Sequence, residues 1–201
     1  MSMPLDDLAD LSDETLLARY AVGDRAAARA LTLRLTPRVL GYAARLLGDR
    51  GEAEDVAQEA LLRLWRIAPD WRSGEAQVTT WLFRVVTNLV TDRQRARMRR
   101  PAAALDDAPE VADTAPGALA WMLERDRMAA LEAGLAQLPD RQRQAVVLRH
   151  IEGLPNPEIA AIMGIGIEAV ESLTARGKRA LAAALAGQRA ALGYEDEGAE
   201  P

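Results

Sequence analysis

The chain has 201 residues, no cysteine, one histidine and a formal net charge of −5. The missing cysteines exclude a disulfide framework and thiolate metal or redox sites, and a single histidine argues against a histidine-centred metal cage or catalytic triad. We therefore expect no metal, no cofactor and no catalytic residue. A low aromatic content, 4%, with abundant alanine and leucine favours an all-α protein.

The first residues carry no sign of export. Residues 1–13 are acidic and lack the basic and apolar segments of a signal peptide. No apolar run approaches the roughly 20 residues needed to cross a bilayer. The sequence predicts a cytoplasmic protein without membrane insertion.

Charge is distributed unevenly along the chain. Six arginines and one acid lie between Arg84 and Arg100, whereas residues 101–120 contain four acids, three prolines and no base. The second segment is typical of a flexible acidic Pro/Ala-rich linker. It divides the chain into lobes at residues 1–100 and 121–190, followed by an acidic tail at 191–201. A basic patch beside an acidic stretch indicates a nucleic-acid surface that is locally masked or works beside a partner.

Apolar residues recur at helical spacing throughout both lobes. In the first lobe we predict a helix capped by Ser12, a helix over about 25–47 with a candidate break at Pro37, and helices beginning near residues 52 and 78. In the second lobe we predict helices over about 121–138, 139–151, 157–163 and 167–185. Asn156 is the expected N-cap of the third of these, and Gly164-Ile165-Gly166 is a tight turn that completes a helix-turn-helix outline.

Four motifs resemble the extracytoplasmic-function (ECF) subfamily of the sigma-70 family of bacterial RNA polymerase sigma factors. They are the region 2.2-like helix Glu54–Arg66, the region 2.3–2.4-like helix Trp81–Arg93, the opening of region 4 at Leu138–Arg143, and the helix-turn-helix around residues 153–165. Their order on both sides of the linker is that of the family. The resemblance implies two small helical domains, region 2 and region 4, in a protein that is not an enzyme. The function implied by the resemblance is to bind core polymerase and direct promoter recognition and transcription initiation, under the control of an anti-sigma factor.

The third predicted helix carries a polar face with one apolar residue. Residues at i, i+3, i+4 and i+7 share that face, namely Asp55, Gln58, Glu59 and Leu62. By resemblance this face, together with Arg63, binds the beta-prime clamp helices of the polymerase core. The alternative is a solvated face opposite the buried Val56 and Leu64.

The loop 69–77 and the helix after it are expected to hold the minus-ten promoter element. Single-stranded DNA is usually bound by a basic track and a pocket for flipped bases. We predict Trp71, Arg72 and Ser73 as the pocket, and a track with Arg84, Asn88, Arg93, Arg95 and Arg97. Trp81 has helical spacing to the apolar residues of its helix, which favours a core position. The alternative for the arginines is a solvated helix end, where cations suit the dipole.

The helix 167–179 is expected to read the minus-thirty-five element in the major groove. The candidate contacts are Glu168, Ala169, Glu171, Ser172, Arg176, Lys178 and Arg179. Its acids are possible acceptors from cytosine N4, and its basic residues suit phosphates. This stretch departs from the family pattern, in which basic and hydroxyl residues are common. His150 is expected on the surface.

The partners implied by the resemblance are core polymerase (beta-prime clamp helices and beta flap), promoter DNA and an anti-sigma factor. Two alternatives remain open. A stand-alone helix-turn-helix regulator would bind DNA without polymerase, and a helical adaptor would bind only protein. Promoter-specific transcription with purified core polymerase separates the adaptor from the sigma factor.

Overall fold

The computed structural model describes residues 6–72, 74, 76–99 and 118–186, and the elements within these ranges are helical, which confirms the all-α prediction. The first lobe contains α1 (Asp6–Ala9), α2 (Asp13–Ala21), α3 (Arg25–Leu47), α4 (Arg50–Ile67), the 3-10 turn η1 (Ala68–Asp70) and α5 (Val78–Arg99). The second lobe contains α6 (Ala118–Ala136), α7 (Asp140–Val146), the π-helical turn η2 (Val147–Ile151), α8 (Asn156–Met163) and α9 (Ile167–Ala186). Ser73, residues 101–117 of the predicted linker and the tail 191–201 lie outside the described residues. The stretch predicted as linker also includes residues 118–120, which belong to α6.

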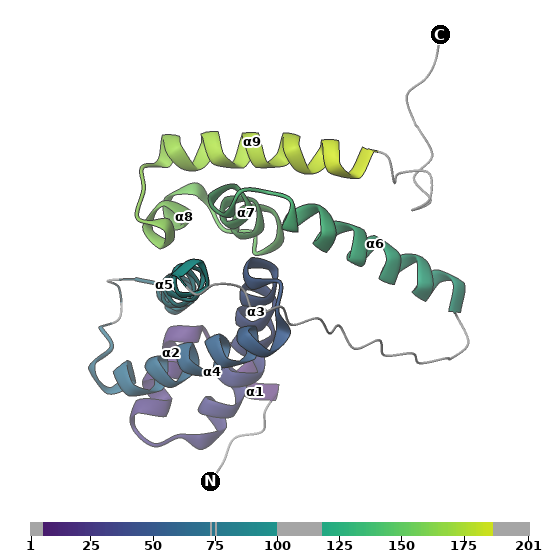
Figure 1. The fold of residues 1–201 in the computed structure, drawn as a ribbon. Coiled ribbons are helices and arrows are strands. Elements are labelled where there is room, and N and C mark those ends of the chain that lie inside the picture. The colour runs from purple at the N-terminus through teal and green to yellow at the C-terminus, as the bar shows by residue number, and fades with distance from the viewer. Residues whose placement is uncertain (1–5, 73, 75, 100–117, 187–201) are drawn as a thin grey trace.

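Helix α3 is the centre of the first lobe, with α2, α4 and α5 packed around it (Figure 1). Its buried stripe repeats at three- and four-residue intervals and includes Leu31, Leu35, Val39, Tyr42 and Leu46. The Tyr42 ring meets Phe83 of α5 edge to face at 5.2 Å, and its hydroxyl bonds to Thr87 Oγ1 at 2.9 Å. These contacts fix α5 against α3 through both apolar and polar groups.

Two details of the predicted helices differ in the structure. Pro37 does not break α3, and the proline lies on the exposed side of the helix, away from the buried stripe. Helix α4 begins at Arg50, before the predicted start, because the Asp49 carboxylate accepts from the Glu52 backbone N–H at 2.8 Å and caps the helix.

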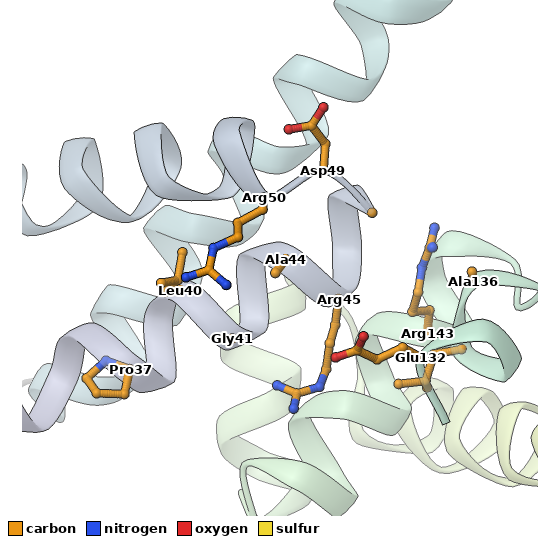
Figure 2. A pocket seen from close by; sticks show the side chains of 12 residues that line it. Pro37, Leu40, Gly41, Ala44, Arg45, Asp49, Arg50, Glu132, Ala136 and Arg143 are labelled. Atoms are coloured by element: carbon orange, nitrogen blue, oxygen red, sulfur yellow. The ribbon is translucent and has the colours of Figure 1, made fainter. Parts of the chain in front are cut away.

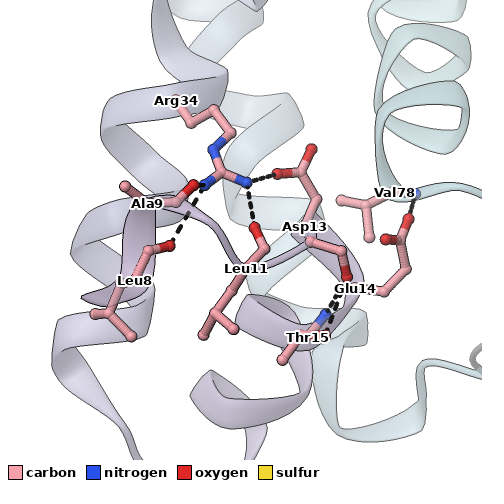
Figure 3. Close-up of polar contacts among 9 residues, drawn as sticks. Leu8, Ala9, Leu11, Asp13, Glu14, Thr15, Arg34 and Val78 are labelled. Carbon is pink, nitrogen blue, oxygen red and sulfur yellow. Dashed lines mark hydrogen bonds and ion pairs between the residues drawn. The ribbon is translucent and has the colours of Figure 1, made fainter. Parts of the chain in front are cut away.

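Polar contacts tie the N-terminal helices to the rest of the first lobe. Arg34 of α3 donates to the Leu11 and Ala9 carbonyls at 2.8 Å and pairs with Asp13 at 2.7 Å (Figure 3). In the same view, Glu14 Oε1 of α2 accepts from the Val78 backbone N–H at 3.1 Å. Glu14 therefore caps α5 from another helix and places a negative charge at its positive end.

The second lobe contains the predicted helix-turn-helix, formed by α8 and α9. Gly164 ends α8 with φ +62°, and its N–H donates to the Ala160 carbonyl, so the chain turns without backbone strain. Asn156 is not the N-cap. Pro155 occupies that position, and the Asn156 side chain instead donates to Glu171 of α9 at 3.4 Å. The sequence Asn-Pro predicted that Asn156 caps α8, but its side-chain amide is bonded to Glu171 of α9 instead.

The helix that begins at Asp140 ends in a π-helical turn that the periodicity did not predict. The Glu152 N–H donates to the Val147 carbonyl at 3.0 Å, five residues earlier. This wider turn buries Val147 and Leu148 while leaving Arg149 and His150 exposed. Gly153, with φ +72°, then ends the turn as expected.

The two lobes pack against each other in the structure. Helix α8 lies along α5, and α3 contacts α6, α7 and η2 (Figure 1). Polar contacts across this interface include Thr80 Oγ1 to Glu158 Oε2 at 2.8 Å and Arg38 Nε to Glu152 Oε2 at 3.1 Å. A cavity of about 660 Å³ lies between α3, α6 and α7, with Arg45 and Arg143 on its walls (Figure 2).

Candidate functional site

The polar face of α4 is exposed along its length. Asp55, Gln58 and Leu62 are exposed, with 42% of Leu62 accessible, while Val56 and Leu64 on the opposite side are buried. Arg63 Nε donates to Glu59 Oε1 at 2.8 Å, which orders both side chains on the surface. The structure thus brings the five residues predicted for polymerase docking together on one accessible helix face.

The predicted basic track on α5 divides between two sides of the helix. Arg93 contacts the Glu52 carbonyl at 3.3 Å and Asp55 at 3.6 Å, and Arg97 pairs with Glu52 at 2.8 Å. These two arginines tie the end of α5 to α4. The three other members of the track, Arg84, Asn88 and Arg95, lie on the exposed side.

A cavity of about 210 Å³ lies at the junction of η1, the following loop and α5. Its walls are Ile67, Asp70, Trp71, Arg72, Ala76 and Trp81. The Trp71 and Trp81 rings meet edge to face at 6.0 Å, and both pack against the core, as expected for Trp81. The buried Trp71 Nε1 has no hydrogen-bond partner among the described residues. The cavity therefore offers aromatic surface and a nearby carboxylate.

The outward face of α9 carries all the residues predicted for base or phosphate contact. Each of them is exposed, namely Glu168, Ala169, Glu171, Ser172, Arg176, Lys178 and Arg179. The buried face uses Val170 and Gly177, and Gly177 lies so close to α7 that a Cβ would sit 2.6 Å from Val146 Cγ2. Because α9 packs closely through the side that carries Val170 and Gly177, its opposite side remains accessible.

Sequence reasoning missed a small basic cluster beside α9. The π-helical turn exposes Arg149 and His150 near Lys178. The pKa of His150 is lowered by partial burial and by the charges of Lys178 and Arg149. Arg149 Nη1 also donates to the Leu154 carbonyl at 3.0 Å, which fixes its direction. No sequence signal pointed to this cluster, because it joins residues from two elements through tertiary packing.

Within residues 6–72, 74, 76–99 and 118–186, no helix combines the length and apolar character needed to span a bilayer. The same part of the chain brings together no group of three side chains suited to hold a metal ion.

Comparison with known proteins matches both lobes. A family model described as Sigma-70 region 2 matches residues 31–100, and one described as Sigma-70, region 4 matches residues 128–181. The RNA polymerase sigma-H factor of Pseudomonas aeruginosa is 33% identical over 89% of this chain and 96% of its own length. The ECF RNA polymerase sigma-E factor of Escherichia coli K12 is 30% identical over 85% of this chain and 93% of its own length.

Two solved structures have a similar fold. CnrH in complex with the cytosolic domain of CnrY has a TM-score of 0.61 and 29% identity, and covers 87% of this chain and 97% of CnrH. The sigma factor RpoE in complex with the anti-sigma factor NepR from Bartonella quintana also has a TM-score of 0.61, at 22% identity, over 77% of this chain and 94% of RpoE. With both family models matched in order and relatives aligned over most of their length, the chain belongs to the ECF subfamily of the sigma-70 family of bacterial RNA polymerase sigma factors.

Proposed function

We propose that this protein binds the RNA polymerase core and directs it to promoters, so that transcription starts where its two lobes contact DNA. The observation that carries the proposal is the exposed face of α4, within the segment matched by the region 2 model. It presents an apolar side chain, Leu62, among ordered polar groups, which is the composition of a protein-binding surface rather than a solvated one. We assign Asp55, Gln58, Glu59, Leu62 and Arg63 to contact with the beta-prime clamp helices.

In this proposal, the first lobe (residues 1–100) also captures the minus-ten strand. Arg84, Asn88 and Arg95 provide the exposed track on α5, and the cavity at Trp71 and Arg72, with Ser73 next to it in sequence, receives an unstacked base. Arg93 and Arg97 act mainly as ties to α4, because their guanidinium groups are already paired.

The second lobe (residues 121–190) is assigned to the minus-thirty-five element. Glu168, Ala169, Glu171 and Ser172 lie on the first turns of α9, the part that enters a major groove in helix-turn-helix proteins. Arg176, Lys178 and Arg179 then face the phosphates, with Arg149 and His150 beside Lys178. The region 4 match and the exposure of these residues support the assignment.

The regulator and the further polymerase contact are proposed from the similarity to known sigma factors. RpoE from Bartonella quintana is bound to an anti-sigma factor, and we infer that this chain is likewise controlled by one. Its proposed action is binding and strand capture without a covalent step, in the cytoplasm where polymerase acts, with the beta flap as a further polymerase contact of the second lobe.

The direct test is a binding titration of the purified chain with sigma-free core polymerase. The variant Gln58→Ala, Glu59→Ala, Leu62→Ala removes the centre of the α4 face, and we expect affinity to fall at least about 100-fold, since interface centres carry most of the binding energy. The control is Arg25→Ala, Arg29→Ala, Leu33→Ala, which removes three exposed side chains from one face of α3. The control should bind like wild type. Failure of well-folded wild type to bind core polymerase would refute the proposal.

A further inference from the structure

The outward face of α9 is divided by charge. The helix lies on the outside of the second lobe, where it contacts α7 and α8 (Figure 1). Its first turns carry two exposed acids, Glu168 and Glu171, and the first basic residue of the helix is Arg176. In the proposed function these first turns enter the major groove, whereas the basic residues face phosphates. The part of the helix that meets the base edges is therefore negatively charged.

The two acids have different surroundings. Glu171 Oε1 accepts from Asn156 Nδ2 of α8 at 3.4 Å, so this carboxylate is directed toward α8. Glu168 lies in the first turn of α9, where an acidic side chain suits the positive end of the helix dipole. Within the part of the chain that the structure describes, no side chain pairs with Glu168. Its carboxylate is thus available to a partner outside the protein.

The side chains beside Glu168 leave it room to reach a base. Ala169 and Ser172 are its exposed neighbours on the helix surface, and both are short. The Glu168 carboxylate therefore extends beyond them. The basic residues begin at Arg176, about two turns further along the helix, where their charges offset the repulsion between Glu168 and the phosphates.

A lone carboxylate distinguishes the four bases in the major groove, because it only accepts hydrogen bonds. Guanine presents the acceptors N7 and O6 there, and thymine presents the acceptor O4, so both bases repel it. Adenine presents its N6 amino group next to the N7 acceptor, whereas cytosine presents its N4 amino group alone. Cytosine is therefore the base that a carboxylate in this groove favours.

We propose that Glu168 selects a cytosine in the upstream promoter element by accepting a hydrogen bond from its N4 amino group. This role rests on the proposed function, in which the first turns of α9 enter the major groove. It makes Glu168 a residue that determines which promoters the protein chooses.

A carboxylate that only repelled the phosphates would have a different effect. Repulsion lowers the affinity for every DNA sequence alike, because phosphates carry no sequence information. Selection lowers the affinity only where the cytosine is replaced by another base. The two effects are separated by the base preference of the protein, whatever its overall affinity.

The test selects DNA with the holoenzyme. Core polymerase is assembled with the full chain, bound duplexes are recovered from a pool of random sequences, and the enriched motif is read by sequencing. The variant is Glu168→Gln, which removes the charge, keeps the size of the side chain and supplies an amide that matches N6 and N7 of adenine. The matched control is Glu132→Gln, the same change at an exposed acid of α6.

We expect the wild-type motif to contain a required cytosine in its upstream element. In the Glu168→Gln variant the ratio of cytosine to adenine at that position should fall at least about fivefold, whereas the control should enrich the wild-type motif. An identical motif for Glu168→Gln and wild type would overturn the inference. So would a variant that recovers more DNA without any change of base. Enrichment of no motif by wild type would refute the proposed function, and the inference with it.

Discussion

Tyr42 is fully buried between α3 and α5, and burial raises the pKa of its phenol far above the ordinary value. Its hydroxyl stays neutral and shares a hydrogen bond with Thr87 Oγ1. This one polar contact in an apolar core helps to set the rotation of α5, and with it the direction of Arg84 and Asn88.

Tyr42→Phe should therefore destabilise the fold by about 1–2 kcal/mol, because Thr87 Oγ1 loses its partner in a buried site. Urea unfolding followed by circular dichroism measures the loss as a lower midpoint with an unchanged slope. Adding Thr87→Val should recover part of it, since the pair is then replaced by two apolar groups. An unchanged midpoint in the single variant would show that the bond contributes nothing.

His150 is the only histidine, so a single imidazole signal reports on the basic cluster beside α9. Its pKa is lowered by partial burial, with Lys178 and Arg149 adding to the effect, so proton NMR should place its midpoint below the ordinary value near 6.5. Lys178→Gln should move the midpoint upward. An unmoved midpoint would show that the charge of Lys178 does not affect the pKa of His150. The unfolded chain binds this proton more readily, so the stability contributed by the neutral imidazole falls as pH drops through about 6.5.

Among the helices, α9 depends on an unusually close contact with α7. A Cβ on Gly177 would lie 2.6 Å from Val146 Cγ2 and 3.2 Å from the Gln142 carbonyl. Gly177→Ala should therefore lower stability by about 1–3 kcal/mol through overpacking, although alanine is the better helix former. Thermal unfolding measures this directly.

Gly51→Ala is the matched control, since its Cβ would meet only Asp49 Oδ1 at an ordinary 3.5 Å. That variant should unfold within about 1 kcal/mol of wild type or become slightly more stable. Equal midpoints for the two variants would contradict the close packing of α9 on α7.

Helix positions were predictable from the sequence because caps and periodicity are local. Ser12, Gly153 and Gly164 mark ends that the structure confirms. The wrong predictions concern side chains whose direction depends on contacts with residues far away in the sequence. Asn156 turns to Glu171 instead of capping α8, and the arginines of α5 divide according to which side meets α4. The π-helical turn at Val147 depends on packing between elements, and a short stretch of sequence does not show which elements pack together.

At the scale of the whole molecule, the relation between the lobes was beyond sequence reasoning. Periodicity predicted two helical units and composition predicted a linker, but neither indicates that Glu158 and Glu152 meet Thr80 and Arg38. These two acids belong to the second lobe, and nothing in the sequence distinguishes them from ordinary surface charges. Their role depends on partners 78 and 114 positions away in the chain.

In the proposed function, this chain gives core polymerase its promoter specificity. The most direct measurement is transcription from genomic DNA fragments with sigma-free core polymerase and the purified chain, with the 5′ ends of the transcripts mapped. We predict a small set of start sites that share two upstream elements, and the loss of these transcripts with the Gln58→Ala, Glu59→Ala, Leu62→Ala variant. Start sites no different from those of core polymerase alone would contradict the account.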